Sequence, residues 1–89
     1  MYTVTYHHKI PDDLSKLSSS QKVAIKKAID EKLILNPQLF GKPLQFSLKG
    51  LRRLRVGDYR VVFLLTDKEI FIILIAHRSK VYSLMQKRK

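Results

Sequence analysis

The chain contains no cysteine, which excludes disulfide bonds and metal sites built from thiolates and suits a reducing compartment. No apolar run approaches the roughly 20 residues that span a membrane, since the longest, from Ile70 to Ala76, has the length of a strand. The opening residues MYTVTYHHK lack the apolar core of a secretion signal. We therefore expect a cytoplasmic protein that forms a single domain over residues 1–89.

Acidic residues are also scarce, and their placement excludes several kinds of catalytic site. The chain has seven Asp and Glu against 18 Lys and Arg, and no two carboxylates form a pair suited to general acid–base catalysis. His7 and His8 would point to opposite faces of a strand, which makes them a poor metal site and indicates surface residues. A Gly-rich phosphate loop and the Cys-His and Ser-His-Asp patterns are absent. We expect no metal and no cofactor, and most classes of hydrolase are excluded.

Positive charge dominates the second half of the chain. The formal net charge is +11, and residues 42–89 contain 12 basic and three acidic residues. A field of this sign attracts polyanions, of which nucleic acid is the first choice, although an acidic protein partner fits the charge equally well. Because the basic residues fall on expected strands and not on an amphipathic helix, we do not expect the chain to bind a membrane surface.

The first half of the sequence predicts one strand and two helices. Residues 2–6 alternate and are rich in aromatic and β-branched side chains, as in a strand. Pro11 begins a short helical segment, with acidic residues at 12 and 13 in its first turn. Apolar residues at helical spacing predict a longer helix over 21–35, which the serines at 18–20 can cap.

The second half predicts three strands, over residues 53–56, 59–65 and 69–77, and their short connections make them an antiparallel meander. The last strand is apolar at every position from 70 to 75, so both of its faces should be covered. The other segments are expected to be a loop over 37–49, a short turn over 79–86 and a frayed basic tail over 87–89. The prediction is an α+β fold: a small, mainly antiparallel sheet of about four strands in the order β-α-α-β-β-β, with two helices packed on one face.

The most informative stretch is LKGLRRLRVGDYRVVF, residues 48–63. Its Gly-Asp pair marks a tight turn between two strands. Alternation along the first strand places Leu54 and Val56 on one face and Arg53 and Arg55 on the other. Guanidinium groups on a rigid strand suit bidentate contact with phosphate, so this hairpin is expected to show apolar residues to the core and arginines to a ligand.

A second basic segment, AHRSKVY, spans residues 76–82 and follows the last expected strand. If this strand end adjoins Arg55 and Arg60, one cleft holds three arginines together with the His77 imidazole and the Tyr82 phenol. Such groups suit metal-independent cleavage of RNA, in which a base takes the proton of a ribose 2′-hydroxyl and that oxygen attacks the neighbouring phosphorus. An acid protonates the departing 5′-oxygen, and cations stabilise the phosphoryl charge. The alternative is that His77 and Tyr82 are ordinary residues at a strand end, with the Tyr ring packed on the core.

The two segments LKGLRRLRVGDYRVVF and IAHRSKVY, in this order, resemble the superfamily of bacterial toxin–antitoxin toxins that includes RelE and ParE, and the RelE branch most closely. The resemblance covers nearly the whole chain, from the first strand to the final HR..VY pattern. It implies a small toxin that cleaves messenger RNA, often in the ribosomal A site, and so stops translation. It also implies a cognate antitoxin whose acidic segment wraps around the toxin.

The resemblance further implies roles for individual residues. Arg60 would stabilise phosphoryl charge, and Tyr82 would orient or deprotonate the 2′-hydroxyl. The prototype RelE toxin has a further arginine where this chain has Ala76, and lysines where this chain has two strand arginines; because arginine rarely releases its proton, we assign more of the acid–base work to His77. The expected catalytic residues are Arg60, Tyr82, His77, Arg55 and Arg78, and the expected RNA-binding residues are Arg53, Arg52, Lys49 and Lys80.

Two other functions stay open on the same sequence. One is a ParE-like inhibitor of DNA gyrase, a toxin without enzymatic activity on the same frame. The other is an RNA-binding module without catalysis, although no aromatic platform of the usual RNA-binding type is evident. The sequence also does not fix ribosome dependence, codon preference or oligomeric state, nor which of His77 and Tyr82 acts as acid and which as base.

Overall fold

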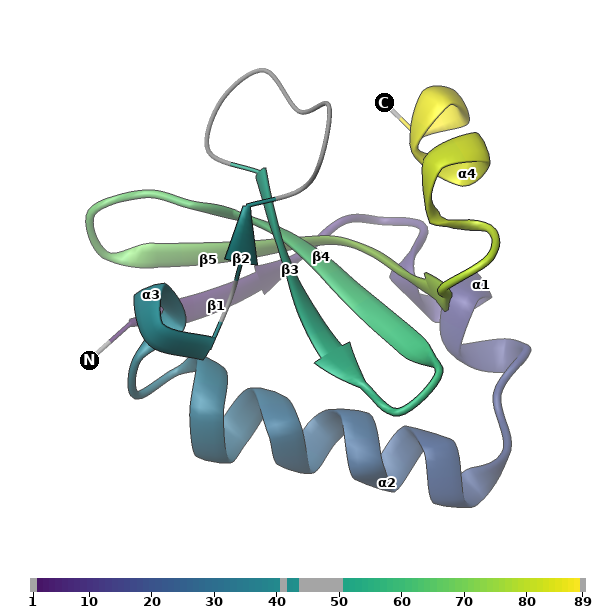
Figure 1. Ribbon diagram of the computed structural model, residues 1–89, viewed down its shortest axis with the longest axis horizontal. Helices are drawn as coiled ribbons and strands as arrows, with labels where there is room; N and C mark the ends of the chain where they lie inside the picture. Colours follow the sequence, from purple (N-terminus) through teal and green to yellow (C-terminus); the bar gives the residue numbers. More distant parts are fainter. Residues whose placement is uncertain (1, 41, 44–50, 89) are drawn as a thin grey trace.

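The computed structural model describes residues 2–40, 42–43 and 51–88. Its strands form one sheet in the order β1-β5-β4-β3-β2 (Figure 1). Strand β1 pairs with β5 in parallel, and the other neighbours pair antiparallel, so the predicted α+β fold with a mainly antiparallel sheet is confirmed. The strands are β1 (Thr3–Tyr6), β2 (Lys42–Pro43), β3 (Leu51–Val56), β4 (Tyr59–Leu65) and β5 (Glu69–His77).

The expected loop over 37–49 is only partly correct. It contains a short helix, α3 (Pro37–Phe40), and the two residues of β2, which pair with Arg52 and Arg53 of β3. Its remaining residues, including Lys49, lie outside the described part of the chain. Two residues give too weak an alternation to be recognised as a strand in the sequence, which explains why the prediction missed β2.

The hairpin of β3 and β4 forms as predicted. Gly57 has φ of 60°, a left-handed conformation that glycine adopts without the steric cost of a Cβ atom. The two-residue turn that results pairs Val56 with Tyr59 and Arg55 with Arg60. This register fixes which side chains of the two strands lie side by side.

Helices α1 (Ile10–Ser15) and α2 (Ser19–Ala28) precede the meander, and α2 continues as a five-residue π-helical segment, η1 (Ile29–Leu33). The predicted cap is present: the Gln21 N–H donates to Ser18 Oγ at 3.2 Å, and the Ser18 N–H donates to Gln21 Oε1 at 2.9 Å. This reciprocal capping box satisfies two backbone donors that the helix itself leaves unpaired. It therefore fixes where α2 begins after the short connection from α1.

The core has two parts, one on each face of the sheet. The larger lies between the sheet and helices α1 and α2, with apolar side chains from all three; its buried members are Ile10, Leu17, Ile25, Ile29, Leu33, Leu54, Val61, Phe63, Ile70, Ile72 and Ile75. The smaller, on the other face, consists of Val62, Leu74, Ala76 and Val81. Both faces of β5 are thus covered, as its continuous apolar sequence predicted.

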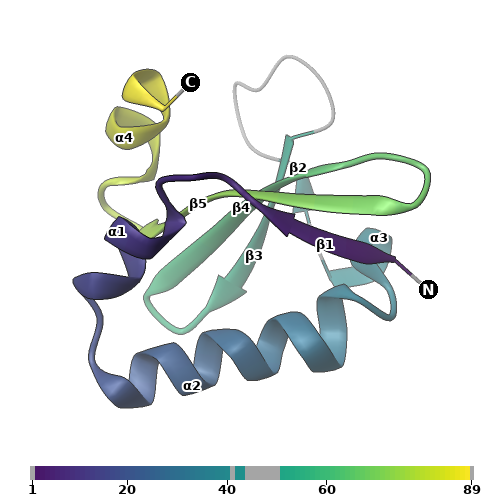
Figure 2. The same ribbon diagram turned by 180° about the vertical axis from the view of Figure 1, so that it is seen from behind.

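The C-terminal segment differs from its prediction in two ways. Residues 81–87 form a helix, α4 (Val81–Lys87), where a short turn was expected, and it covers the smaller core on the face opposite α2 (Figure 1). Arg88, expected in a frayed tail, makes a buried ion pair with Asp13 of α1. Figure 2 shows α1 and α4 at the same end of the sheet. His7 is also buried, at 7% exposure, where a surface residue was expected, and its Nδ1 accepts the Lys9 N–H.

Within the described ranges, no helix combines the length and apolar character needed to cross a bilayer. A further feature of the sheet is the face on which most arginines of the β3–β4 hairpin lie. Arg53, Arg55 and Arg60 of β3 and β4 face the side on which α4 lies, and not the side that α2 covers.

Candidate active site

A pocket of about 360 Å³ opens where the arginine-bearing strands meet the start of α4. Its lining residues come from three segments that are separate in the sequence: the β3–β4 hairpin, the end of β5 with the residues that follow it, and the first turn of α4. Its lining residues are Arg53, Arg60, His77, Arg78, Ser79, Val81 and Tyr82. The two basic segments singled out in the sequence thus meet in one hollow, as predicted.

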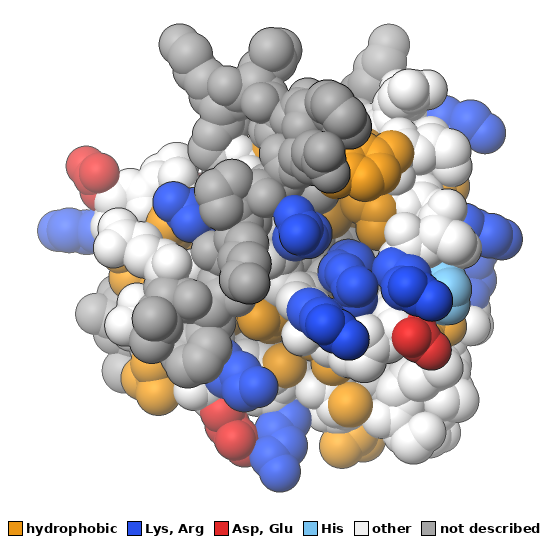
Figure 3. All heavy atoms as spheres, in the orientation of Figure 1, with side chains coloured by type: hydrophobic (Ala, Val, Ile, Leu, Met, Phe, Trp, Pro, Cys, Tyr) orange, Lys and Arg blue, Asp and Glu red, His pale blue; other side chains and the backbone are white. Residues whose placement is uncertain are grey.

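Strand register explains how the arginines gather. Arg60 on β4 pairs with Arg55 on β3 and, on its other side, with Ala76 on β5. Since Leu54 points into the core beneath α2, its neighbours Arg53 and Arg55 point to the opposite face of the sheet. Figure 3 shows Lys and Arg side chains gathered over β3 and β4 beside the start of α4, with a His and an acidic side chain next to them.

The Arg60 guanidinium is held by its own turn. Its Nη1 donates to the carbonyl oxygens of Gly57, at 3.0 Å, and Tyr59, at 2.9 Å. Nη2 and Nε make no hydrogen bond to the residues that the structure describes, which leaves two donors for a ligand. Burial lowers the pKa of Arg60 from its usual value, and the nearby charges of Arg55, Arg53 and Arg78 lower it further, while Asp58 opposes them. The local field therefore favours an anion.

The His77 ring is oriented by two contacts. The Ser79 N–H donates to His77 Nδ1 at 3.2 Å, and Ser79 Oγ lies 2.9 Å from the same nitrogen. On its other side, the ring meets Tyr59 edge-on, with centroids 5.5 Å apart and planes at 83°. Because Nδ1 accepts a backbone N–H, the neutral ring carries its proton on Nε2. In this geometry His77 presents Nε2–H as a hydrogen-bond donor, and its expected part in proton transfer stays a prediction.

Tyr82 and Arg78 stand at the edge of the pocket. Tyr82 is the second residue of α4 and is 43% exposed, so its ring is not packed into the core as the alternative interpretation required. The Arg78 N–H donates to the Asp58 carbonyl at 2.8 Å, and Arg78 Nε lies 3.8 Å from Asp58 Oδ1. The turn between β3 and β4 is thereby tied to the segment that follows β5. Arg60 and Tyr82 line the same pocket and do not lie on opposite sides of the sheet.

Not all the expected site residues converge here. Arg55 adjoins Arg60 across the strand pair but does not line the pocket, and Lys80 is exposed just before α4. Arg52 pairs with Phe63, which lies in the core beneath α2, so it belongs to the other face of the sheet. Lys49 lies outside the described residues.

Sequence reasoning missed two contributors. Ser79 orients His77, and its position two residues after the histidine was the available signal, since short polar side chains and their backbone often bond a neighbour at that spacing. Asp58, interpreted only as a turn residue, also holds Arg78. Across the described ranges, no three His, Asp or Glu side chains group closely enough to hold a metal ion.

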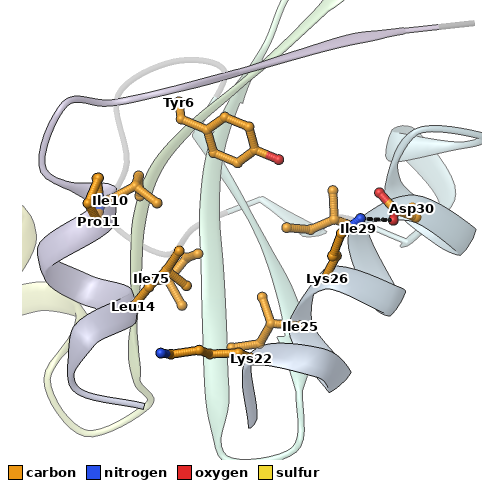
Figure 4. A pocket seen from close by; sticks show the side chains of 10 residues that line it. All are labelled: Tyr6, Ile10, Pro11, Leu14, Lys22, Ile25, Lys26, Ile29, Asp30 and Ile75. Atoms are coloured by element: carbon orange, nitrogen blue, oxygen red, sulfur yellow. Dashed lines mark hydrogen bonds and ion pairs between the residues drawn. The ribbon is translucent and has the colours of Figure 1, made fainter. Parts of the chain in front are cut away.

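A second hollow, of about 440 Å³, lies between α1 and α2, on the face of the sheet opposite to the arginine pocket. Figure 4 shows Tyr6, Ile10 and Leu14 facing Ile25 of α2 and Ile29 of η1 across it. Lysines 22 and 26 stand at its rim, the second paired with Asp30 at 2.8 Å. The groove is therefore apolar inside and mainly basic at the edge. None of the described residues lines both this groove and the arginine pocket.

Comparison with known proteins gives consistent results. A family model described as ParE toxin of type II toxin-antitoxin system, parDE, matches residues 4–82. Toxin RelE of Mycobacterium tuberculosis is 40% identical over 72 residues, which are 79% of this chain and 74% of that protein.

Solved structures agree with the sequence matches. The toxin–antitoxin complex RelBE2 of Mycobacterium tuberculosis includes a chain with 30% identity and a TM-score of 0.78, covering 86% of this chain and 98% of that one. The isolated RelE toxin of E. coli has a TM-score of 0.73 at 23% identity, covering 98% and 97%, and so shares the fold. The predicted resemblance is confirmed, and the chain belongs to the RelE/ParE family as a RelE-type toxin of a type II toxin–antitoxin system.

Proposed function

We propose that this toxin is an endoribonuclease that cleaves messenger RNA in the cytoplasm, on the ribosome, without a metal ion. The observation that carries the proposal is the single pocket that holds two strand arginines, Arg78, His77 and Tyr82. Three arginines and no acid among the described lining residues give the pocket a positive field that attracts a phosphodiester. A phenol and an imidazole beside them supply the groups that the chemistry requires. The RelE-type relatives support the same assignment.

The reaction consists of one balanced transfer at phosphorus. The ribose 2′-oxygen loses its proton and bonds to the neighbouring phosphorus, and the bond from phosphorus to the 5′-oxygen of the next nucleotide breaks. The departing oxygen gains a proton, so the products are a 2′,3′-cyclic phosphate and a 5′-hydroxyl. Charge on the phosphoryl oxygens increases in the transition state, and fixed cations stabilise it most when they are already in place.

The proposal gives each side chain of the pocket a part. Arg60, held at Nη1 by its turn, offers its two remaining donor nitrogens to the phosphoryl oxygens, and Arg78 adds a second cation. Tyr82 stands exposed at the pocket edge, where its phenol can bond the 2′-hydroxyl. His77 offers Nε2–H to an oxygen of the phosphate. Arg53 and Arg55 continue the basic surface along β3 and would hold the flanking backbone.

Induction of the toxin in growing cells separates the two toxin mechanisms. The endoribonuclease is expected to reduce full-length messenger within minutes, before any sign of DNA damage, because cleavage acts directly on the translated RNA. A gyrase inhibitor would instead induce the DNA-damage response while messenger stays intact. Northern blots of an abundant messenger and a damage-responsive reporter, sampled together, measure both. Intact messenger during growth arrest would reject the proposed function, and RNA binding without cleavage by the purified toxin would favour the non-catalytic module.

We also propose that the groove between α1 and α2 takes an antitoxin segment that is apolar on one side and acidic at its edge. The lining is mostly apolar, and Lys22 stands exposed at the rim. Asp30 is the one acid among the described groove residues, and Lys26 already engages it. The solved relatives include toxin–antitoxin complexes, so a partner of this kind is expected. A segment with carboxylates along its margin would match this rim.

Reversing one rim charge is expected to weaken the antitoxin complex. Lys22→Glu should raise the dissociation constant about 5–10-fold at low salt, mostly through slower association, because rim charges act chiefly on encounter. Lys27→Glu is the matched control, since Lys27 is exposed on the same helix but does not line the groove. Binding kinetics with the antitoxin encoded beside the toxin would measure both variants. Equal effects of the two substitutions would place the antitoxin elsewhere.

A further inference from the structure

A buried ion pair joins helix α1 to the residue that follows helix α4. Asp13 of α1 and Arg88, the residue after α4, make two parallel contacts: Oδ1 to Nη2 at 2.8 Å and Oδ2 to Nη1 at 3.0 Å. The two side chains are 6% and 11% exposed. A bidentate geometry of this kind is directional, and loss of one partner would leave the other charge buried without compensation.

The same pair completes the edge of the sheet. Strand β1 pairs with β5 only as far as Ile72, so the last part of β5 continues beyond the end of its neighbour. There the Ile75 N–H donates to Asp13 Oδ2 at 3.0 Å, and Arg88 Nη1 donates to the Ile73 carbonyl at 2.9 Å. The carboxylate and the guanidinium thus replace the backbone partners that a longer β1 would supply. Each group is held by the sheet as well as by the other.

Helix α4 depends on such anchoring because seven residues are too few for a stable isolated helix. Val81 buries its side chain at the start of the helix, and Leu84 and Met85 are only partly buried against the smaller core. Arg88 fastens the other end. Tyr82 lies six residues before Arg88, or about 9 Å along a helix, so the direction of α4 decides where the phenol stands relative to Arg60.

We propose that Asp13 and Arg88 are positioning residues, which fix α4 so that Tyr82 lines the arginine pocket. The structural half of this inference concerns the helix alone, and the catalytic half rests on the proposed endoribonuclease function. Neither residue touches the pocket, since neither belongs to its lining. Their effect on RNA cleavage would therefore be indirect, through the placement of α4.

Hydrogen exchange tests the structural half without any substrate. In Arg88→Gln and in Asp13→Asn, the Leu84 amide, which donates to the Lys80 carbonyl, is expected to exchange at least about 10-fold faster than in the parent. Amides of β4 should keep their protection if only α4 loosens. Lys87→Gln is the matched control, because it removes one positive charge from the same turn and leaves the ion pair intact. Parent-like exchange of the Leu84 amide in folded Arg88→Gln protein would overturn the inference.

Cleavage kinetics test the catalytic half. Arg88→Gln is expected to lower kcat about 3–10-fold with KM within about twofold, as for a change that acts on the transition state. Arg88→Lys, which keeps the charge, should recover part of this loss. In a Tyr82→Phe background the Arg88→Gln change should cost little more, because coupled residues are not additive. An equal loss in both backgrounds would show that Arg88 does not act through Tyr82 and would overturn the positioning role.

The two experiments distinguish a failure of the proposed function from a failure of the positioning role. If the parent toxin cleaves no RNA, the proposed function fails, and exchange at α4 alone decides whether the pair fixes the helix. If α4 loosens in Arg88→Gln while cleavage is unchanged and Tyr82→Phe remains impaired, the positioning role is overturned and the proposed function stands. For a variant that does not fold, the doubly neutral Asp13→Asn with Arg88→Gln removes both buried charges at once and is used for the same measurements.

Discussion

Replacing Arg60 by alanine is expected to lower the rate of messenger cleavage about 10²–10³-fold, the cost typical of removing one preorganised donor from a developing oxyanion. The fold determines the position of Arg60, because two carbonyl oxygens of the β3–β4 turn hold its Nη1. Burial and three neighbouring cations lower its pKa from the usual value, so the site gains electrostatically when a phosphate arrives. Single-turnover cleavage of a defined messenger on purified ribosomes would measure the loss.

Two further variants separate the role of Arg60 from a general effect of charge. Arg60→Lys keeps the positive charge but loses the planar fork, so it should recover only part of the rate. Arg52→Ala removes an arginine from the same hairpin on the face toward α2, and it is expected to change the rate less than about threefold, because Arg52 does not line the arginine pocket. Parent-like cleavage by Arg60→Ala, or an equal loss in Arg52→Ala, would contradict the assignment.

The hairpin could be predicted from the sequence because its determinants are local. Strand alternation assigned Leu54 to the core and Arg53 to the opposite face, and the structure confirms both. The Gly-Asp pair fixed the turn, since a left-handed residue is needed there and Gly57 supplies it. Once turn and alternation are known, the pairing of Arg55 with Arg60 follows from counting along the strands.

The C-terminal segment could not be predicted in the same way, because its structure depends on distant partners. Residues 81–87 are too short for a convincing helical period, and the helix forms on the smaller core and is fastened by Arg88. The ion pair joins residues that are 75 positions apart, and no sequence pattern near either residue indicates its partner. Asp13 matched the ordinary preference for acids at the start of a helix, which concealed its second role.

The orientation of the His77 ring also could not be predicted from the sequence. A histidine at the end of a strand can act as acid, base or donor, and the sequence does not reveal that the Ser79 N–H donates to Nδ1. Similarly, a register shift at Val62 and Phe63 changes which side chains of β5 face α4, and alternation alone does not reveal it. These features decide the chemistry of the pocket although they hardly affect the fold class.

Tyr82→Phe removes one hydroxyl group and is expected to lower cleavage about 10²–10⁴-fold, the range for a positioned group that exchanges a proton with the substrate. Tyr82 is the candidate because its ring is exposed at the pocket, whereas His77 already uses Nδ1 to accept a backbone hydrogen bond. RNA binding should be nearly unchanged, since the arginines that attract the phosphates remain. Single-turnover rates and anisotropy with a labelled RNA would measure the two effects separately.

Tyr6→Phe serves as the matched control for Tyr82→Phe. Tyr6 is also an exposed tyrosine, at 54%, but it lies on β1 at the groove between α1 and α2, away from the arginine pocket. The Tyr6→Phe variant should cleave RNA at the rate of the parent toxin. Combining Tyr82→Phe with Arg60→Ala gives a sharper test: if both side chains act on one phosphodiester, the double variant should lose much less than the product of the single losses, because residues that act as a unit are not additive. Fully multiplicative losses would mean that the phenol and the guanidinium do not share a transition state, and the base would then have to be sought elsewhere along the pocket.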